Sequence, residues 1–266
     1  MAPKWRDLAD RLAEQIRNGE YAPGDQLPQI RELVESGEGS KATVNQAYKA
    51  LETEGLVTST RGRGTVVRPH TPLKRLGIAR YDKAKWRDGD EVAFIADRVA
   101  SGRSYDRNEQ TQTVSRVKAP AVVAAAHGLP EGADVYARAR LVKEGTQPTH
   151  TLTSYYRPEH VEGTRIVNPE PGPAGRGGGF RVLYDAGYEI DHMTEELFAR
   201  VPTAEEAHLL QLSPGEWVME LHRTTRTADG TVVEFAIGVH AATRFAWSYD
   251  FKVPDSAKTL VEGERT

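Results

Sequence analysis

The residues of this chain with the clearest chemical potential are two arginines, Arg138 and Arg140, separated by one position. They lie in a β-prone run, residues 134–144, and side chains two positions apart in a β-strand point to the same face of the sheet. Paired guanidinium groups bind carboxylate or phosphate oxygens through charge-assisted hydrogen bonds. The spacing therefore predicts an anion-binding face. The alternative is an exposed strand edge whose arginines pair with Glu or Asp.

Two further polar pairs share strand faces in the same half of the chain. Ser154 and Tyr156 are two positions apart on the expected return strand, residues 147–157. Glu234 and His240 are six positions apart on a later strand and also share a face. Each of these residues is a candidate ligand contact. The alternative is that the Glu and the His are satisfied at the surface or in the core.

A diverged internal repeat positions these residues. Each unit has a helix that starts with proline, a glycine turn and two strands, at residues 119–128, 134–144 and 147–157 and again at 202–212, 217–227 and 231–241. Three residues recur at an offset of 83 positions: Gly132 and Gly215, Val135 and Val218, Arg140 and Arg223. Two helix-plus-hairpin units predict an α+β domain with an antiparallel sheet and helices on one side. We expect a ligand to bind between the two units.

A glycine-rich stretch, residues 175–179, precedes an expected helix at residues 180–186. The N–H groups at a glycine-rich helix start can bind anions. A plain loop is the alternative, and we do not include this stretch among the expected ligand contacts.

The N-terminal quarter of the chain reads as helix, turn, helix and hairpin. Apolar stripes of helical spacing lie at Trp5, Leu8, Leu12 and Ile16 and at Val44, Ala47, Tyr48 and Leu51, with a short helix containing Ile30, Leu33 and Val34 between them. Ser40 suits the N-cap of the last helix, and two short β-prone runs flank a basic glycine turn at residues 61–64. This layout is typical of a winged helix-turn-helix, which places its second helix in a DNA groove. A protein-interaction module is the alternative.

The distribution of charge supports DNA binding although the net charge is −3. Residues 40–75 contain seven basic and two acidic side chains, so positive charge is concentrated on the second helix, the wing and the segment after it. Such local charge attracts the phosphate backbone. Residues 68–87 contain seven basic residues and one acidic residue. This segment begins with a proline-rich linker, which either contacts DNA or is simply solvated.

At the N-terminus the chain resembles the winged helix-turn-helix of the GntR family of bacterial transcription regulators. The resemblance covers about residues 3–68 and rests on the motif at residues 27–33, the run at residues 50–56 and the wing at residues 61–65. It implies DNA contacts at Arg31, Ser40, Lys41, Thr43, Asn45, Arg61 and Gly62, and the wing-tip charge adds Arg63. The chain departs from the family pattern at Ile30, Gly39, Lys41 and Asn45.

The rest of the chain, from about residue 86 to residue 254, resembles UTRA, the effector-binding domain of the HutC subfamily of GntR regulators. The matching motifs are residues 138–140, 153–156, 212–215 and 229–234. The resemblance implies a chorismate-lyase-like fold and an effector pocket lined by Arg138, Arg140, Ser154, Glu234 and His240, to which we add Tyr156 because it shares a strand face with Ser154. Histidine stands at position 240, where the family often has tyrosine.

Composition excludes several other classes of protein. The chain of 266 residues is 38% hydrophobic and 27% charged, as expected for a globular protein, and no apolar run approaches the length of a membrane span. It has no cysteine, which excludes thiol chemistry and fits a reducing cytoplasm. The N-terminus does not resemble a signal peptide. The histidines lack metal-ligand spacing, so we expect no metal and no other cofactor.

We therefore expect a DNA-binding domain at residues 1–68, a linker at 69–85, an effector-binding and dimerisation domain at 86–254 and a tail at 255–266. The expected protein is a cytoplasmic bacterial homodimer that binds a near-palindromic double-stranded operator, associates with the nucleoid when bound, and acts as a repressor modulated by a small, anionic effector. It is not expected to be an enzyme. The alternative is that the C-terminal domain acts as a lyase-like enzyme on a small carboxylate or phosphate.

Overall fold

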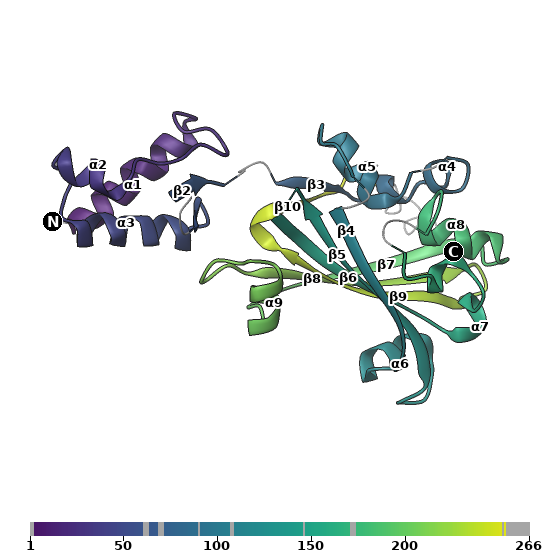
Figure 1. Ribbon diagram of the computed structural model, residues 1–266. Helices are drawn as coiled ribbons and strands as arrows, with labels where there is room; N and C mark the ends of the chain where they lie inside the picture. Colours follow the sequence, from purple (N-terminus) through teal and green to yellow (C-terminus); the bar gives the residue numbers. More distant parts are fainter. Residues whose placement is uncertain are drawn as a thin grey trace, which may run out of the picture.

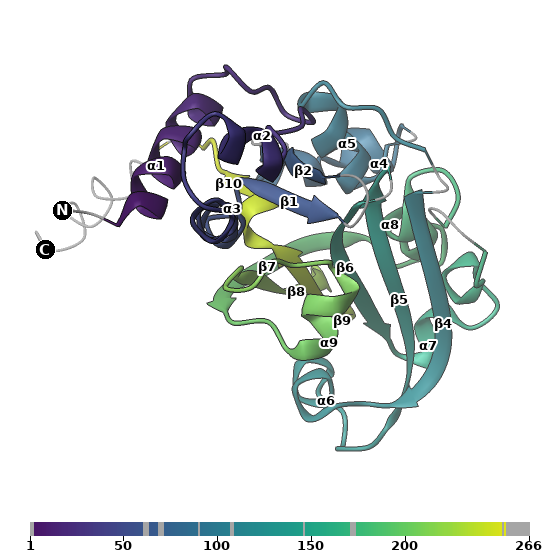
Figure 2. The same cartoon turned by 60° about the vertical axis from the view of Figure 1, so that its left-hand side comes forward.

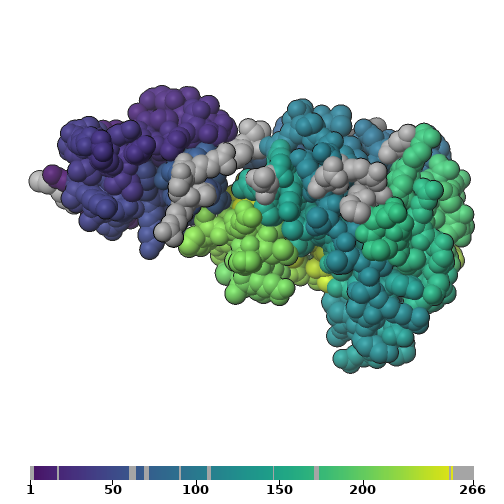
Figure 3. All heavy atoms as spheres, in the orientation of Figure 1, coloured from purple at the N-terminus to yellow at the C-terminus, as the bar shows by residue number. Residues whose placement is uncertain are grey.

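The computed structural model describes residues 3–60, 64–68, 72–89, 91–106, 109–145, 147–170, 174–251 and 253. The chain forms a small N-terminal lobe and a larger C-terminal lobe built on a sheet (Figures 1 and 3). The expected wing-tip contacts Arg61, Gly62 and Arg63 lie outside the described residues. Within the described parts of the chain, no helix is both long and apolar enough to cross a membrane.

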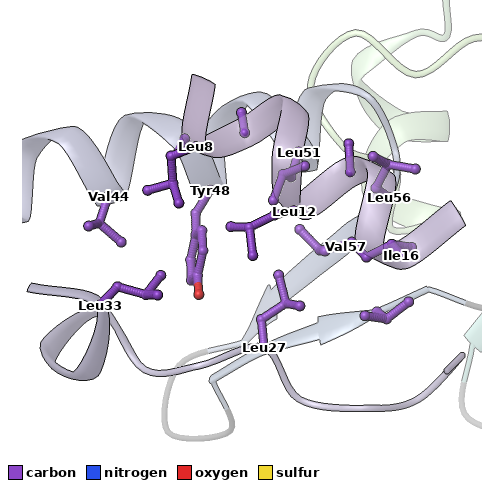
Figure 4. Close-up of a cluster of buried hydrophobic side chains, with 14 residues drawn as sticks. Leu8, Leu12, Ile16, Leu27, Leu33, Val44, Tyr48, Leu51, Leu56 and Val57 are labelled. Carbon is purple, nitrogen blue, oxygen red and sulfur yellow. The ribbon is translucent and has the colours of Figure 1, made fainter. Parts of the chain in front are cut away.

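The N-terminal lobe has three helices and a two-stranded antiparallel hairpin. The elements are α1 (Lys4–Arg17), α2 (Ile30–Glu35), α3 (Lys41–Thr53), β1 (Val57–Thr60) and β2 (Gly64–Val67). Figure 4 shows how the apolar stripes of α1 and α3 meet over Leu27 and Leu33. Val44 and Leu51 have no exposed surface, and burial of a side chain of this size contributes about 1.5–3 kcal/mol. This core fixes the orientation of α3.

The C-terminal lobe contains a six-stranded antiparallel sheet in the order β4-β5-β6-β9-β8-β7. The strands are β4 (Gln110–Lys118), β5 (Asp134–Glu144), β6 (Gln147–Tyr156), β7 (Ile190–Arg200), β8 (Val218–Thr227) and β9 (Val232–Ala241). Helix α6 (Ala121–His127) precedes β5 and β6, and α9 (Ala204–Leu209) precedes β8 and β9. Each half of the sheet is therefore a strand, a helix and a hairpin, and the halves meet where β6 pairs with β9.

The prediction that helices cover one side of the sheet is wrong. Helices α6 and α9 pack on the face that contains Phe235 and Val239. The opposite face, which contains Glu234 and His240, is covered by α8 (Gly178–Asp185), the 3-10 helix η1 (Ile78–Tyr81) and α5 (Ala93–Ala100), as Figure 1 shows. Consecutive residues of β9 are buried because both faces of this central strand are covered.

A short parallel sheet holds the segment after the linker on the C-terminal lobe. Strand β3 (Leu73–Leu76) follows the linker and pairs in parallel with β10 (Phe245–Ser248), with Leu73 opposite Phe245. Other elements of the described residues include α4 (Lys83–Trp86), α7 (Pro158–Val161) and the 3-10 helices η3 (Arg165–Val167) and η4 (Ala242–Arg244). Residues 73–85, which we expected to belong to the linker, thus form β3, η1 and most of α4 against the C-terminal lobe.

Candidate functional site

Four of the five expected DNA contacts that the structure describes lie around the N-terminal end of α3. Ser40 caps the helix, because its Oγ accepts a hydrogen bond from the Thr43 amide at 3.2 Å, and the hydroxyl oxygens of these two residues are 3.0 Å apart. Lys41 and Asn45 are exposed, whereas Thr43 is half-buried. A helix start with exposed polar side chains is the part of a helix-turn-helix that reaches base edges and phosphates.

Arg31 is exposed at the second position of α2. Its Nε lies 3.0 Å from Glu35 Oε1, and the two side chains are 83% and 63% exposed. Ion pairs this exposed contribute little to stability. Arg31 can therefore exchange Glu35 for a DNA phosphate at small cost.

Two departures from the family pattern have packing reasons in the structure. Gly39 has φ +154°, and a β-carbon there would lie 2.8 Å from Cγ2 of Thr43. Ile30 begins α2 and packs, partly buried, against the core of the N-terminal lobe. Gly39 thus allows the turn to approach α3 closely, and Ile30 extends the core of the N-terminal lobe.

Three basic residues near the linker are turned away from solvent. Arg68, Arg75 and Arg80 are 7%, 2% and 7% exposed. Each forms an ion pair with a carboxylate, from Glu216, Glu195 and Asp97 respectively. These arginines belong to contacts with the C-terminal lobe, which removes them from the candidates for DNA contact.

A cavity of about 80 Å³ lies on the face of the sheet that α8, η1 and α5 cover. Five of the six expected effector contacts line it: Arg138, Arg140, Tyr156, Glu234 and His240. The sixth, Ser154, is fully buried and accepts a hydrogen bond from Nη2 of Arg140 at 2.6 Å. The structure therefore brings all six residues together, from both halves of the sheet.

Glu234 is the centre of a buried hydrogen-bond network. Its Oε2 accepts from Arg223 Nη2 at 2.8 Å and from the Thr225 hydroxyl at 3.1 Å, and its Oε1 accepts from the Tyr156 hydroxyl at 3.0 Å. Burial alone would raise the pKa of Glu234, but the charge of Arg223 and the hydrogen bonds outweigh it and the pKa is lowered. The carboxylate is therefore ionised and holds Arg223 and Tyr156 in place.

The described hydrogen-bond partners of Arg138 and Arg140 are neutral groups. Arg138 donates to the Ile166 carbonyl at 3.0 Å and to Oε1 of Gln112 at 2.6 Å. Burial and the neighbouring charge of Arg140 lower the pKa of Arg138 to about 10, and burial also lowers the pKa of Arg140. At a pKa of about 10, Arg138 remains charged at neutral pH.

The charge of the cavity favours an anionic ligand. Among the described lining residues, five are arginines and one is a carboxylate: Arg75, Arg80, Arg138, Arg140, Arg223 and Glu234. Ligand pockets for small molecules usually enclose about 300–1,000 Å³. A ligand much larger than a phosphate ion therefore requires some of these side chains to move.

Several lining residues were missed by sequence reasoning. Arg223 could have been found, because it recurs at the repeat offset from Arg140 and both point into the cavity. Arg75 and Arg80 lie in the segment expected to be a linker, and no motif in the sequence marks His150 as a pocket residue. The glycine-rich stretch at residues 177–179 also lines the cavity. In the described parts of the chain, no cluster of three or more His, Asp or Glu side chains could hold a metal ion.

A winged helix-turn-helix joined to an α+β domain with an arginine-lined cavity defines a DNA-binding protein with a ligand-binding domain. Residues 5–67 match the family of bacterial regulatory proteins called gntR, and residues 105–246 match the UTRA domain. The chain belongs to the GntR family of bacterial transcription regulators and carries a UTRA domain.

Relatives and solved structures agree with this assignment. An uncharacterised HTH-type transcriptional regulator of Streptomyces coelicolor is 86% identical over 263 residues, which cover 99% of this chain and 98% of the relative. The transcriptional repressor NagR of Bacillus subtilis is 26% identical, covering 92% of this chain and 93% of its own. A crystal structure of a GntR-family regulator, 25% identical, has a TM-score of 0.57 and covers 95% of this chain and 99% of its own.

The structure of PhnF from Mycobacterium smegmatis shares the fold, with a TM-score of 0.56 at 21% identity over 92% of this chain and 99% of its own. Together these findings confirm the expected α+β fold class, with a winged helix-turn-helix and a chorismate-lyase-like domain. They also confirm that the protein is a transcriptional regulator with a DNA-binding and an effector-binding domain, not an enzyme.

Proposed function

We propose that this regulator is a repressor whose DNA affinity changes when a small anionic effector binds in the arginine-lined cavity. The observation that carries the proposal is the composition of that cavity, with five arginines and one carboxylate among its described lining residues. Guanidinium groups held on rigid strands suit a carboxylate or a phosphate. Arg138, Arg140, Ser154, Tyr156, Glu234 and His240 are the proposed effector contacts.

On the DNA side, the proposed contacts are Arg31, Ser40, Lys41, Thr43, Asn45, Arg61, Gly62 and Arg63. We propose a cytoplasmic homodimer, assembled through the C-terminal domain, whose two winged-helix domains bind a near-palindromic operator. Repression is favoured over activation because NagR of Bacillus subtilis, similar along most of its length, is a repressor by name. The end of the DNA-binding domain near residue 68 and the end of the C-terminal domain near residue 254 are part of this proposal.

A promoter-binding experiment tests the proposal. Duplex DNA from upstream of the protein's own gene should bind in a salt-dependent way, and one member of a panel of small carboxylates and phosphates should both raise the melting temperature and change the DNA affinity. If this DNA does not bind at moderate salt, the proposal that the protein represses through DNA next to its own gene is wrong.

A double variant tests the cavity. Arg138→Gln with Arg140→Gln should abolish the response to the active anion while the DNA affinity without the anion stays unchanged. Arg116→Gln is the matched control, because Arg116 lies on the neighbouring strand β4, pairs with Asp134 at 3.4 Å and is 52% exposed. A response that survives the double variant would show that the effector binds elsewhere.

A further inference from the structure

The two lobes are joined by a buried polar cluster that consists of Arg68, Ser213, Glu216 and Thr243, called here the interdomain cluster. Arg68 follows β2 of the winged-helix domain, and its Nη1 donates to Oε2 of Glu216 at 3.0 Å. Its Nη2 donates to the Ser213 hydroxyl, and its Nε donates to the Thr58 hydroxyl at 2.6 Å. One arginine thus bonds to both domains.

Glu216 has partners at both of its carboxylate oxygens. Besides Arg68, Oε2 accepts from the Ser213 amide at 3.0 Å, and Oε1 accepts from the Thr243 hydroxyl. Burial would raise the pKa of Glu216, but the hydrogen bonds from Thr243 and Ser213 and the charge of Arg68 lower it. The side chains of Arg68 and Glu216 are 7% and 2% exposed. A buried pair with this many partners favours one arrangement of the groups that it joins.

The C-terminal end of α3 lies against the same place. A β-carbon on Gly55 would lie 3.6 Å from Thr243 Cγ2, and one on Gly215 would lie 3.7 Å from Thr53 Cγ2. In Figure 2, with the N-terminal lobe turned forward, α3 is seen nearly end-on. Helix α3, which carries most of the proposed DNA contacts that the structure describes, therefore ends at the interdomain cluster. The cluster thus fixes the orientation of α3 relative to the C-terminal domain.

The cluster is also connected to the cavity through one short stretch of chain. Strand β9 carries His240 in the cavity wall and continues into Thr243 of the cluster and then into Phe245. The Phe245 ring packs edge-on against His240, with centroids 4.9 Å apart, and against His150 at 5.3 Å. Between them, Arg244 Nη1 donates to the Leu210 carbonyl at 2.9 Å. A movement of His240 would therefore displace Thr243, which bonds to Glu216, and Arg244, which bonds to the segment before Ser213.

The chain on the far side of the linker is attached to the same stretch. Leu73, the first residue of β3, pairs with Phe245, and Arg75 of β3 lines the cavity. The linker is thus held at one end by Arg68 in the cluster and at the other end by β10. Gln211, whose carbonyl accepts from Arg244 at 3.1 Å, has φ +50°, the one positive φ of a non-glycine residue among those described. Backbone strain of this kind is common in elements that switch.

We infer that the interdomain cluster holds the winged-helix domain in one orientation, and that residues 241–245 transmit the state of the cavity to it. A ligand that displaces His240 shifts Thr243 and Phe245, loosens the contact of Glu216 with Arg68 and frees α3 to reorient. The coupling is a change in the equilibrium between domain arrangements. This inference takes the identity of the ligand site from the proposed function. The contacts between the two domains on which it is built do not depend on that function.

The orientation of the domains can be measured directly. Because the chain has no cysteine, Asp10→Cys and Glu131→Cys, both at exposed positions, introduce one label on each domain. An excess of unlabelled chain keeps one labelled copy in each assembly. Single-molecule energy transfer should show one narrow distance distribution in the otherwise unchanged chain. Glu216→Gln should broaden or split this distribution. The milder Thr243→Val should do the same, and it serves as the test if Glu216→Gln fails to fold.

Two comparisons make the result specific. Glu109 forms an ion pair with Arg98 at 2.5 Å, and both residues lie within the C-terminal domain. Glu109→Gln removes this carboxylate and should leave the distribution narrow. A narrow distribution in both cluster variants, or equal broadening by Glu109→Gln, would overturn the role of the cluster. For the connection to the cavity, His240→Ala should broaden the distribution, whereas Val142→Ala, in the same cavity wall on β5, should not. An unchanged distribution in His240→Ala would refute the transmission through residues 241–245.

Failure of this inference is distinguishable from failure of the proposed function. The distance measurement needs neither DNA nor an identified effector. A protein that shows the expected broadening but binds no promoter DNA would contradict the proposed function alone. A protein that binds DNA and responds to an anion equally well with and without Glu216→Gln would contradict the inference alone.

Discussion

His150 and His240 lie opposite each other on β6 and β9, with their rings stacked 4.7 Å apart and 4° from parallel. They are 6% and 4% exposed, and the Thr149 hydroxyl lies 3.0 Å from Nδ1 of His150. Burial above all, and then nearby positive charge, lowers the pKa of both well below the ordinary histidine value. The two rings are therefore neutral at neutral pH and form an uncharged wall of a cationic cavity.

The histidine pair predicts a loss of stability in mild acid. A histidine whose pKa is lowered by folding takes up its proton more readily in the unfolded chain, so stability is complete above the ordinary pKa of about 6.5 and declines as the pH falls below it. The charges that oppose protonation come from four elements: Arg75 on β3, Arg80 on η1, Arg98 on α5 and Arg140 on β5. The melting temperature should fall between about pH 6.5 and pH 5.

A variant separates this effect from general acid sensitivity. His150→Phe keeps an aromatic ring on β6 but cannot be protonated, so the decline in melting temperature should be shallower. His192→Gln is the control, because the His192 side chain is 78% exposed. If both variants follow the same curve as the unchanged protein, the buried pair does not account for the acid sensitivity.

The local structure of this chain could be predicted closely from sequence, because it depends on neighbouring residues. The expected strand at residues 134–144 is β5, and the repeat offset placed the second hairpin, since glycine turns and alternating side chains are local signals. Period-two alternation also placed Arg138 beside Arg140, and Ser154 beside Tyr156, on one face.

The rest of the site depends on contacts between distant segments, which local patterns do not encode. His150 meets His240 only through the register of β6 on β9. Arg75 enters the cavity because β3 pairs with β10, far away in the chain. The sequence does indicate that both faces of the sheet are covered. The largely apolar run of β9 is typical of a strand that is buried on two sides.

Lys41 offers a test of the DNA-binding surface. It is exposed at the first position of α3, where a lysine contacts phosphate rather than a particular base. Lys41→Ala should weaken binding to all duplexes similarly and reduce the slope of log affinity against log salt by about 0.9 for each DNA phosphate that is no longer neutralised. Lys118→Ala, on β4 with a side chain 73% exposed, should leave both quantities unchanged. A change in base preference without a change in slope would instead indicate a direct base contact.

Gly39 should be intolerant of a β-carbon for a reason that a second substitution can isolate. Gly39→Ala combines a positive φ with a contact of 2.8 Å to Thr43 Cγ2 and should destabilise the protein by about 1–2 kcal/mol. Thr43→Ser removes that methyl group but keeps the hydroxyl next to Ser40. Denaturant unfolding of the double variant should therefore recover part of the loss. Strictly additive effects would assign the cost to the backbone and to the β-carbon of residue 43, 3.0 Å away, which serine keeps.

Glu234 should show opposite effects on stability and on anion binding. Glu234→Gln leaves the buried Arg223 without its counter-charge, and removal of one partner of a buried ion pair costs about 3–5 kcal/mol. Because folding lowers the pKa of Glu234, its contribution is present above the ordinary glutamate value and is lost as the pH falls through the lowered one. The deficit of the variant should therefore be largest at neutral pH and shrink in acid.

The same substitution removes the one carboxylate among the described residues that line the cavity, so the cavity gains net positive charge. Inorganic phosphate, used as a probe, should therefore bind more tightly to Glu234→Gln than to the unchanged protein by calorimetry, although the variant melts at a lower temperature. Glu220→Gln is the matched control, because that carboxylate pairs with Arg200 on the other face of the sheet. Weaker phosphate binding in Glu234→Gln would mean that the carboxylate organises the arginines for the anion more than its charge repels it.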